Sequence, residues 1–562
     1  MPTLPAYLLN LCTFGLFFFT ALLLSLVFTP ASIRIAKFLG IIDTPDLRKV
    51  HRDPIPRMGG LAIACTILLA ALLCAKFTPF IQAYLLGMGT IASIGLIDDK
   101  FSIPPIIKLI GEIISSLIFV LLSGHTLSGF GNLLGIGDIS FSYWALPLTI
   151  FFMAGVINSF NLSDGLDGLA GGISLIGCLF LLPMLYAAQL WSVLGLTVII
   201  MGTLLGFLHY NSYPAKLFMG DTGSLILGYS FTCIALSLVQ PSANQVMIAP
   251  VSVFIPISFP IVDMMFVIGK RLIKKRHIFS ADKLHFHHRL MAIGMPHSLV
   301  VTIIYGICFV LGLIGWNSNR LEEWKQFSIV SFFFVLLYSA LWVLEIKGTV
   351  FNRSYKVTIR HRIVDTKYIV ISSVGRLSKY VAPIFLFLLV FPILFIRSTP
   401  GPFALLALTV SLLVGILYPW QGGKRRINHA HALIFIAIFS LLAILHFNPE
   451  APRWANIYFA GLTGLAAGWV LIRIFSKKRY VVLFPTSFEI LLIVISWFIP
   501  LVWGGLVGMD PASQEILVLV CFQSIPILAA AKTMLRRQAK RNAIVTGILV
   551  FALLYLGGRA FL

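Results

Sequence analysis

The sequence is a succession of apolar runs of about 17–24 residues, each long enough to cross the hydrocarbon core of a bilayer as a helix. Hydrophobic residues make up 59% of the chain and charged residues only 11%. A soluble domain of this size could not cover that much apolar surface with polar side chains. The pattern therefore predicts an all-α polytopic membrane protein with about 18 transmembrane helices, about eleven of them before residue 346.

The net charge of +22 follows from topology and does not indicate a nucleic-acid ligand. If the N-terminus lies outside and the runs alternate, most of the 42 Lys and Arg residues fall on cytoplasmic loops or helix ends. Cytoplasmic loops are expected to carry this excess. We therefore expect the lipid bilayer and not nucleic acid as a partner. No cleavable signal peptide is expected either, because no basic region precedes the first run.

With this orientation, polar chemistry gathers on one side of the membrane. The cytoplasmic loops rich in Asp, Asn, His and Gly are 43–60, 97–102, 158–172, 211–224 and 279–290. The outer loop at 124–142 has a single carboxylate, Asp138. Solvated connectors would instead be rich in Lys, Glu and Ser. The distribution thus predicts catalytic loops on the cytoplasmic face.

Two adjacent carboxylates end one predicted span, and a lysine follows in the next. Asp98 and Asp99 repel each other unless a metal or cation lies near, so their position at a membrane boundary is costly without a role. Lys108 is such a cation, with Glu112 at i+4 as its expected partner. A pair of aspartates also suits a simple helix stop, and these residues alone leave both interpretations open.

Asn158, Asn161, Asp164 and Asp167 recur every three residues, so neighbours in the series face each other on a helix. Hard oxygen ligands of this kind suit Mg²⁺ together with substrate phosphates, with Mn²⁺ as the alternative ion. Asp221 follows in a Gly-Asp-Thr-Gly turn that begins another span, where backbone N–H groups face an anion. A lone turn of this type is usually an N-cap, but two acidic glycine-rich loops on one face favour a shared site.

Three histidines and an arginine lie close together in the last of these loops. His285, His287 and His288 precede Arg289, and no Cys accompanies them. Adjacent histidines do not easily ligate one ion, so zinc is the less favoured alternative. Imidazoles and a guanidinium suit phosphate oxygens, which Arg binds bidentately.

Taken together, the loops resemble one family, the polyprenyl-phosphate N-acetylhexosamine-1-phosphate transferases, which start O-antigen, teichoic-acid and peptidoglycan lipid intermediates. The similarity runs in order from residue 41 to 297, through IDTPDLRKVH, PIPRMGG, IDDK, NLSDGLDGLAGG, NSYPAKLFMGDTGS and HFHHRL. The residues of these motifs are more similar to those of the branch that uses donors such as UDP-N-acetylglucosamine. The runner-up is the phospho-MurNAc-pentapeptide transferase of peptidoglycan synthesis.

The resemblance implies transfer of a sugar-1-phosphate from a UDP-N-acetylhexosamine to undecaprenyl phosphate, with release of UMP at the bacterial inner membrane. It implies that Asn161 and Asp221 hold Mg²⁺, and that Asp98 and Asp99 lie by the acceptor phosphate as positioning groups or a mild base. Lys108 would bind phosphate beside them. The other expected substrate-binding residues are Lys49, Asn158, Asp164, Asp167, Asn211, His285, His287, His288 and Arg289. One-step and covalent-aspartate mechanisms both remain open.

The resemblance covers a transferase domain at 1–345 and ends there. Residues 346–380 form a basic cytoplasmic linker with an alternating pattern that predicts a short strand or hairpin. Residues 381–562 form a C-terminal membrane domain of about seven helices without a recognised motif. A transporter or flippase needs ionisable groups near mid-membrane, and only Glu489 lies inside a span there. The alternative is a scaffold that docks a downstream glycosyltransferase or a twin subunit.

Overall fold

The computed structural model describes residues 6–43, 54–240, 248–275, 284–317 and 321–346, and five single positions between 458 and 465. The chain divides into two compact units, one of residues 1–356 with 486–491 and one of the remainder. All elements below belong to the first unit. Lys49 and the expected linker at 346–380 lie outside the described residues, and so does the expected domain at 381–562 apart from the five single positions.

The described part of the first unit is helical apart from two short antiparallel strand pairs. Its α-helices are α1 (Ala6–Phe38), α2 (Gly59–Cys74), α3 (Pro79–Phe101), α4 (Pro105–Ser123), α5 (Ala145–Ser163), α6 (Leu169–Ala187), α7 (Trp191–Asn211), α8 (Gly220–Val239), α9 (Pro250–Phe254), α10 (Ser258–Ile273), α11 (Phe286–Ala292), α12 (His297–Asn317) and α13 (Glu323–Ile346). The 3₁₀ turns are η1 (Ser142–Trp144) and η2 (Ile255–Ile257). Strand β1 (Ile42–Asp43) pairs with β2 (Ile55–Pro56), and β3 (Gly129–Gly131) with β4 (Ile139–Ser140).

The helices agree with the expected spans over this part of the chain. Ten segments are long and apolar enough to cross a membrane, and α2 is a shorter apolar helix of 16 residues. Together they correspond to the eleven runs expected before residue 346. The protein is thus an all-α polytopic membrane protein, as predicted. The seven runs expected beyond residue 380 fall outside the described helices.

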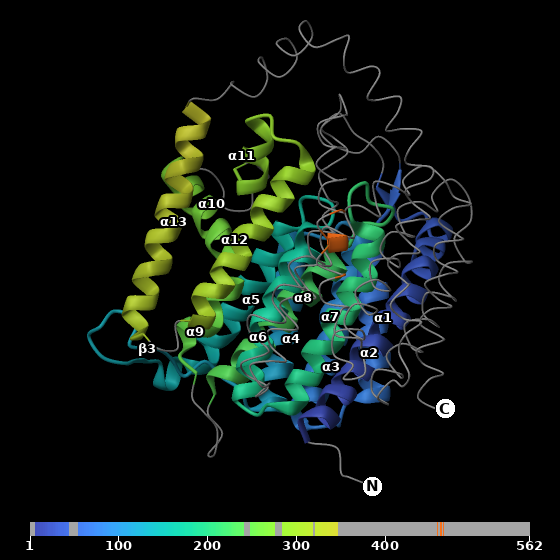
Figure 1. The fold of residues 1–562 in the computed structure, drawn as a ribbon, viewed down its shortest axis with the longest axis horizontal. Helices are drawn as coiled ribbons and strands as arrows, with labels where there is room; N and C mark the ends of the chain where they lie inside the picture. Colours follow the sequence, from blue (N-terminus) through green and yellow to red (C-terminus); the bar gives the residue numbers. More distant parts are fainter. Residues whose placement is uncertain are drawn as a thin grey trace, which may run out of the picture. The chain divides into compact units, whose positions relative to one another are not determined.

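Helices α6, α7 and α8 form the centre of this unit, since almost every residue in them is buried. α1 and α2 lie on one side of these helices, and α12 and α13 on the other (Figure 1). Polar side chains inside the bundle bond to nearby groups, as in the pairing of Tyr84 Oη with Ser230 Oγ at 2.8 Å between α3 and α8. Such pairing is required where water does not reach.

The start of α2 lies directly against the start of α8. The Gly59 and Gly60 N–H groups donate to the carbonyls of Phe218 and Met219 at 2.9 and 2.7 Å. A Cβ atom on Gly60 would collide with the backbone of Gly223, so only glycine allows the helices to approach this closely. The contact brings the residues before α2 to the N-terminus of α8.

Candidate active site

The turn between α3 and α4 brings Asp98 to Lys108. α3 ends at Phe101, and Ser102 adopts a left-handed conformation and donates its N–H to the Asp98 carbonyl. The Asp98 carboxylate accepts the N–H of Ile103 at 2.9 Å and pairs with Lys108 Nζ at 2.7 Å. A carboxylate at the end of one span and an ammonium in the first turn of the next are thus held together at one boundary of the bundle.

Asp99 points instead at the N-terminus of α8. Its carboxylate accepts the N–H groups of Asp221 and Thr222 at 2.8 and 3.2 Å, and the Thr222 hydroxyl at 2.6 Å. The first N–H groups of a helix have no partner within it and favour anions. Gly220, with φ of 73°, leaves the room that this carboxylate occupies. The anion at the start of this span is therefore Asp99 itself.

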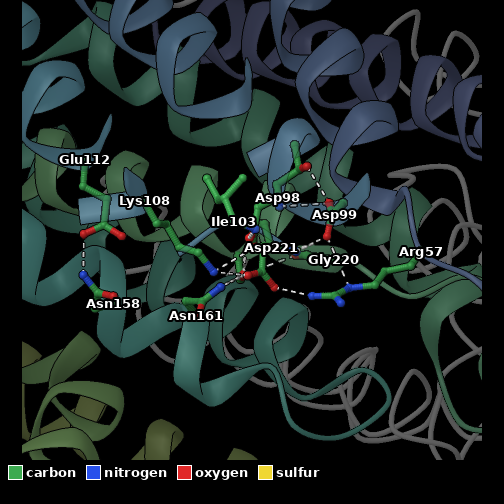
Figure 2. A network of polar contacts seen from close by, with 12 residues as sticks. Arg57, Asp98, Asp99, Ile103, Lys108, Glu112, Asn158, Asn161, Gly220 and Asp221 are labelled. Carbon is green, nitrogen blue, oxygen red and sulfur yellow. Dashed lines mark hydrogen bonds and ion pairs between the residues drawn. The ribbon is translucent and has the colours of Figure 1, made fainter. Parts of the chain in front are cut away.

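Asp221 lies between two cations from distant parts of the chain. One oxygen accepts a hydrogen bond from Arg57 Nη2 at 2.5 Å, and the other pairs with Lys108 Nζ. Arg57 Nε also reaches Asp99 at 3.2 Å. Figure 2 shows the resulting chain of contacts from Asp98 to Arg57. The Asp99 side chain has no exposed surface, whereas those of Asp221, Lys108 and Arg57 are 17%, 18% and 35% exposed. These three side chains form the accessible part of the cluster.

Arg57 had no predicted role, although it lies in the quoted segment PIPRMGG. Its place is fixed by backbone contacts, since its N–H donates to the Ile41 carbonyl at 3.1 Å and it forms a parallel bridge with Phe218. Opposed burial and charge effects act on its guanidinium. Burial lowers the pKa of Arg57, but the carboxylates of Asp221 and Asp99 outweigh this effect and raise it. The sequence signal was a basic residue two positions before a pair of glycines, Gly59 and Gly60.

α5 extends to Ser163 and carries both asparagines on one face. Asn161 Nδ2 donates to Ser224 Oγ at 2.9 Å, and its side-chain oxygen, Oδ1, has no hydrogen-bond partner among the described residues. Asn158 Nδ2 donates to the Glu112 carboxylate and to the Ala154 carbonyl. The expected pairing of Glu112 with Lys108 was wrong, because Lys108 is bound by carboxylates from α3 and α8.

The loop between α5 and α6 is hydrogen-bonded to the end of α7 and to the loop between α7 and α8. Asp167 accepts the N–H of Ala215 at 2.9 Å, and its own N–H donates to His297 Nε2 at 3.1 Å. Asn211 accepts the N–H of Gly168 at 3.0 Å and donates to the Leu217 carbonyl at 2.9 Å. The structure thus places Asp167 and Asn211 in contacts that hold the two expected loops together.

The cluster contains more negative than positive charge. Asp98, Asp99, Asp164 and Asp221 face only Arg57 and Lys108 among its described cations. Burial, followed by repulsion from Asp221, raises the pKa of Asp164 to about 7. A cluster with this imbalance attracts a further cation.

Of the histidine segment, residues 285–289, only a part lies against the loop between α5 and α6. His287 Nε2 touches Gly165 and has no hydrogen-bond partner in the part of the chain that the structure describes. Burial lowers the pKa of His287 well below its usual range. His285 Nδ1 bonds to Asp263 at 2.9 Å. Arg289 forms a bidentate pair with Glu345 at 2.6 and 2.7 Å. The ring of His288 is tilted against the ring of its neighbour His287.

Comparison with known proteins gives one consistent result. Residues 81–239 match the profile of glycosyl transferase family 4. The chain is 35% identical over 343 residues to a Bacillus subtilis protein named "Probable undecaprenyl-phosphate N-acetylglucosaminyl 1-phosphate transferase", covering 60% of this chain and 93% of the relative. The chain belongs to the polyprenyl-phosphate N-acetylglucosamine-1-phosphate transferase family.

Two further relatives of the transferase carry similar names. The undecaprenyl-phosphate alpha-N-acetylglucosaminyl 1-phosphate transferase of Yersinia pestis is 27% identical, with 58% of this chain and 91% of the relative covered. The decaprenyl-phosphate N-acetylglucosaminephosphotransferase of Mycobacterium leprae is 30% identical, with 48% and 75% covered. The profile match includes the aspartates and the lysine that form the cluster and excludes Arg57 and the histidine segment.

Proposed function

We propose that this transferase moves N-acetylglucosamine-1-phosphate from UDP-N-acetylglucosamine to undecaprenyl phosphate and releases UMP. The observation that carries the proposal is the position of Asp221, between Lys108 and Arg57 and beside Asp98 and Asp99, at the ends of apolar helices. A site at the ends of membrane-spanning helices suits an acceptor whose tail is lipid and whose phosphate is polar. The names of the relatives support the sugar and the carrier.

Mg²⁺ is the proposed cofactor, and the residues present suit it. The ligands of the ion would be the Asp221 carboxylate and the side-chain oxygen of Asn161. This oxygen is available because the side-chain nitrogen of Asn161 makes the bond to Ser224. Among the described residues no three His, Cys, Asp or Glu side chains gather into a complete ligand set. Mg²⁺ commonly takes one or two carboxylates and completes its shell with substrate phosphates and water. When bound, it would reduce the charge of the donor pyrophosphate.

The reaction forms one phosphorus–oxygen bond and breaks another. An oxygen of the acceptor phosphate attacks the β-phosphorus of the UDP-sugar, and the bond from that phosphorus to the oxygen of UMP breaks. A phosphate monoester has a second pKa of about 6, so the acceptor is already anionic at neutral pH and needs little general base. The protein must instead offset charge at the attacked phosphorus and on the leaving group.

Lys108 and Arg57 supply that positive charge. Both are held by carboxylates, and both remain partly exposed, so phosphate oxygens can reach them. Asp98 positions Lys108 through the 2.7 Å pair, and Asp99 positions Arg57 and the start of α8. The two aspartates thus act as positioning groups for the cations in this proposal. Preorganised charge of this kind needs no rearrangement during the reaction.

Replacing Arg57 tests a role that the sequence alone did not indicate. Arg57→Ala is expected to lower kcat by about 10²-fold, because the guanidinium binds two carboxylates that a small side chain leaves unpaired. Arg57→Lys keeps the positive charge and should recover only part of the lost activity. The recovery is partial because one ammonium cannot reproduce the contacts of both Nε and Nη2. Equal activity of Arg57→Ala and the unsubstituted enzyme would remove Arg57 from the site.

The site is proposed to face the cytoplasm of the bacterial inner membrane, as the positive-inside pattern favours. In a cysteine-free background, Ser102→Cys and Lys275→Cys should react with a membrane-impermeant maleimide only after the cells are opened. Ser140→Cys lies beyond one more span and should react in intact cells. All three positions are exposed. Labelling of Ser102→Cys from outside would reverse the assigned orientation.

Donor choice tests the function itself. Purified enzyme with undecaprenyl phosphate and Mg²⁺ should release UMP from UDP-N-acetylglucosamine, and removal of the ion with EDTA should stop the release. UDP-MurNAc-pentapeptide is the comparison donor. Release of UMP from the pentapeptide donor alone would assign the chain to peptidoglycan precursor synthesis and reject the proposed sugar.

A further inference from the structure

Glu112 is a fully buried carboxyl group inside a membrane span. It lies in α4 one turn beyond Lys108 and has 0% exposed surface. Its Oε1 atom has no hydrogen-bond partner among the residues that the structure describes. Ionisable groups at such positions are costly and usually have a functional reason. Lys108 does not supply that reason, because its ammonium pairs with Asp98 and Asp221.

The partner of Glu112 is the amide of Asn158. A carboxamide nitrogen carries two N–H groups. In Asn158 one of them donates to Glu112 Oε2 and the other donates to the Ala154 carbonyl at 3.0 Å. The carbonyl oxygen is therefore the only polar atom of this side chain left for a ligand. Figure 2 shows the Asn158 nitrogen facing Glu112 and its oxygen on the side of Asn161.

Asn158 and Asn161 lie on the same face of α5, since residues three apart are neighbours on a helix. Both direct their nitrogen away, to Glu112 and to Ser224, and keep an oxygen free. Deprotonated phosphate oxygens only accept hydrogen bonds, so the Asn158 oxygen cannot bind them. It suits a group that donates a hydrogen bond, such as a hydroxyl or an amide N–H of a sugar.

We propose that Glu112 is a positioning residue, which fixes the Asn158 amide so that its oxygen faces the donor sugar. This rests on the proposed function and assigns the sugar-binding end of the same site. Without Glu112, only the bond to the Ala154 carbonyl remains to hold the Asn158 amide nitrogen, so its oxygen is held less firmly toward the sugar. The carboxylate contributes by accepting a hydrogen bond, and its negative charge is not required.

The test separates hydrogen bonding from charge. Glu112→Ala should lower kcat/KM for UDP-N-acetylglucosamine by about 10- to 100-fold, as loss of a supporting hydrogen bond commonly does. Glu112→Gln should retain most of the rate, because its side-chain oxygen accepts the same bond. Ser116→Ala is the matched control, since this buried hydroxyl on the next turn of α4 donates to the backbone carbonyl of Glu112 and bonds to no other described residue.

An exchange of the pair makes the test sharper. Asn158→Asp places two carboxyl groups face to face and should lose activity. The double variant Glu112→Gln with Asn158→Asp restores one donor and one acceptor, and should be at least tenfold more active than Asn158→Asp alone. Should Glu112→Ala fail to fold, this exchange still decides the question.

Several results would overturn the positioning role. Loss of activity in Glu112→Gln equal to that in Glu112→Ala would show that the charge or a proton of Glu112 is needed. Failure of the double variant to exceed Asn158→Asp would show that the pair does not orient the amide. An equal loss in Ser116→Ala would indicate general packing. Unsubstituted enzyme without UMP release would instead reject the proposed function, on which this inference rests.

Discussion

Asp221→Asn is expected to lower the rate of UMP release by about 10³-fold while the protein still inserts and purifies normally. Asp221 joins both cations of the site and is the proposed carboxylate ligand of Mg²⁺. An amide keeps the shape of the side chain but carries no charge to hold the ion, Lys108 or Arg57. The loss should be greatest at limiting Mg²⁺, where metal affinity controls the rate.

The control for this substitution is Asp138→Asn. Asp138 is an exposed aspartate in the loop between β3 and β4, one span away from the cluster. The same chemical change there should leave turnover unaltered. Wild-type turnover of Asp221→Asn at limiting Mg²⁺ would show that Asp221 is not a ligand of the ion, and the proposed arrangement would fall.

Lys108→Gln is expected to lower kcat by about 10²-fold or more. Its ammonium contacts Asp98 and Asp221 together, so the substitution leaves two carboxylates without a cation and removes positive charge from the phosphate site. Repulsion between them should also lower thermal stability in detergent. Both effects can be measured on one preparation, by UMP release and by thermal unfolding.

Lys100→Gln is the matched control for Lys108→Gln. Lys100 also lies at this boundary of the bundle, at the end of α3, but it is exposed and lies over the ring of Phe101. Its removal should change neither rate nor stability. If Lys100→Gln and Lys108→Gln behaved alike, the loss would reflect surface charge at the membrane and not the site.

The spans and the acidic cluster could be predicted because both depend on local sequence. A run of apolar residues long enough to cross a bilayer has few other structures open to it. Once the spans were placed, alternation alone put Asp98, Lys108, Asn161 and Asp221 at the same side of the membrane. In the structure Lys108 contacts both Asp98 and Asp221.

The partners of these residues could not be predicted, because they depend on packing between helices. Glu112 was expected to pair with Lys108 from i,i+4 spacing, but carboxylates on α3 and α8 lie closer to the ammonium. The role of Arg57 was not predicted, because its side chain meets Asp221 only after backbone bonds bring together two segments more than 150 residues apart in the sequence. Spacing along one helix contains no information on such contacts.

The role of Asp99 illustrates the same limit. The resemblance implied that both aspartates lie by the acceptor phosphate, and in the structure their side chains diverge, one to Lys108 and one to the N-terminus of α8. Neighbouring residues on a helix point in directions about 100° apart, so they commonly serve different partners. Which partner each one meets is set by where α4 and α8 pack against α3.

In the proposed reaction the β-phosphate of the donor travels with the sugar. UDP-N-acetylglucosamine labelled with ³²P at the β-phosphate, incubated with purified enzyme, undecaprenyl phosphate and Mg²⁺, tests this directly. We expect the label to enter the lipid phase and unlabelled UMP to appear in equal amount. Release of labelled UDP into the aqueous phase, with sugar alone on the lipid, would contradict it.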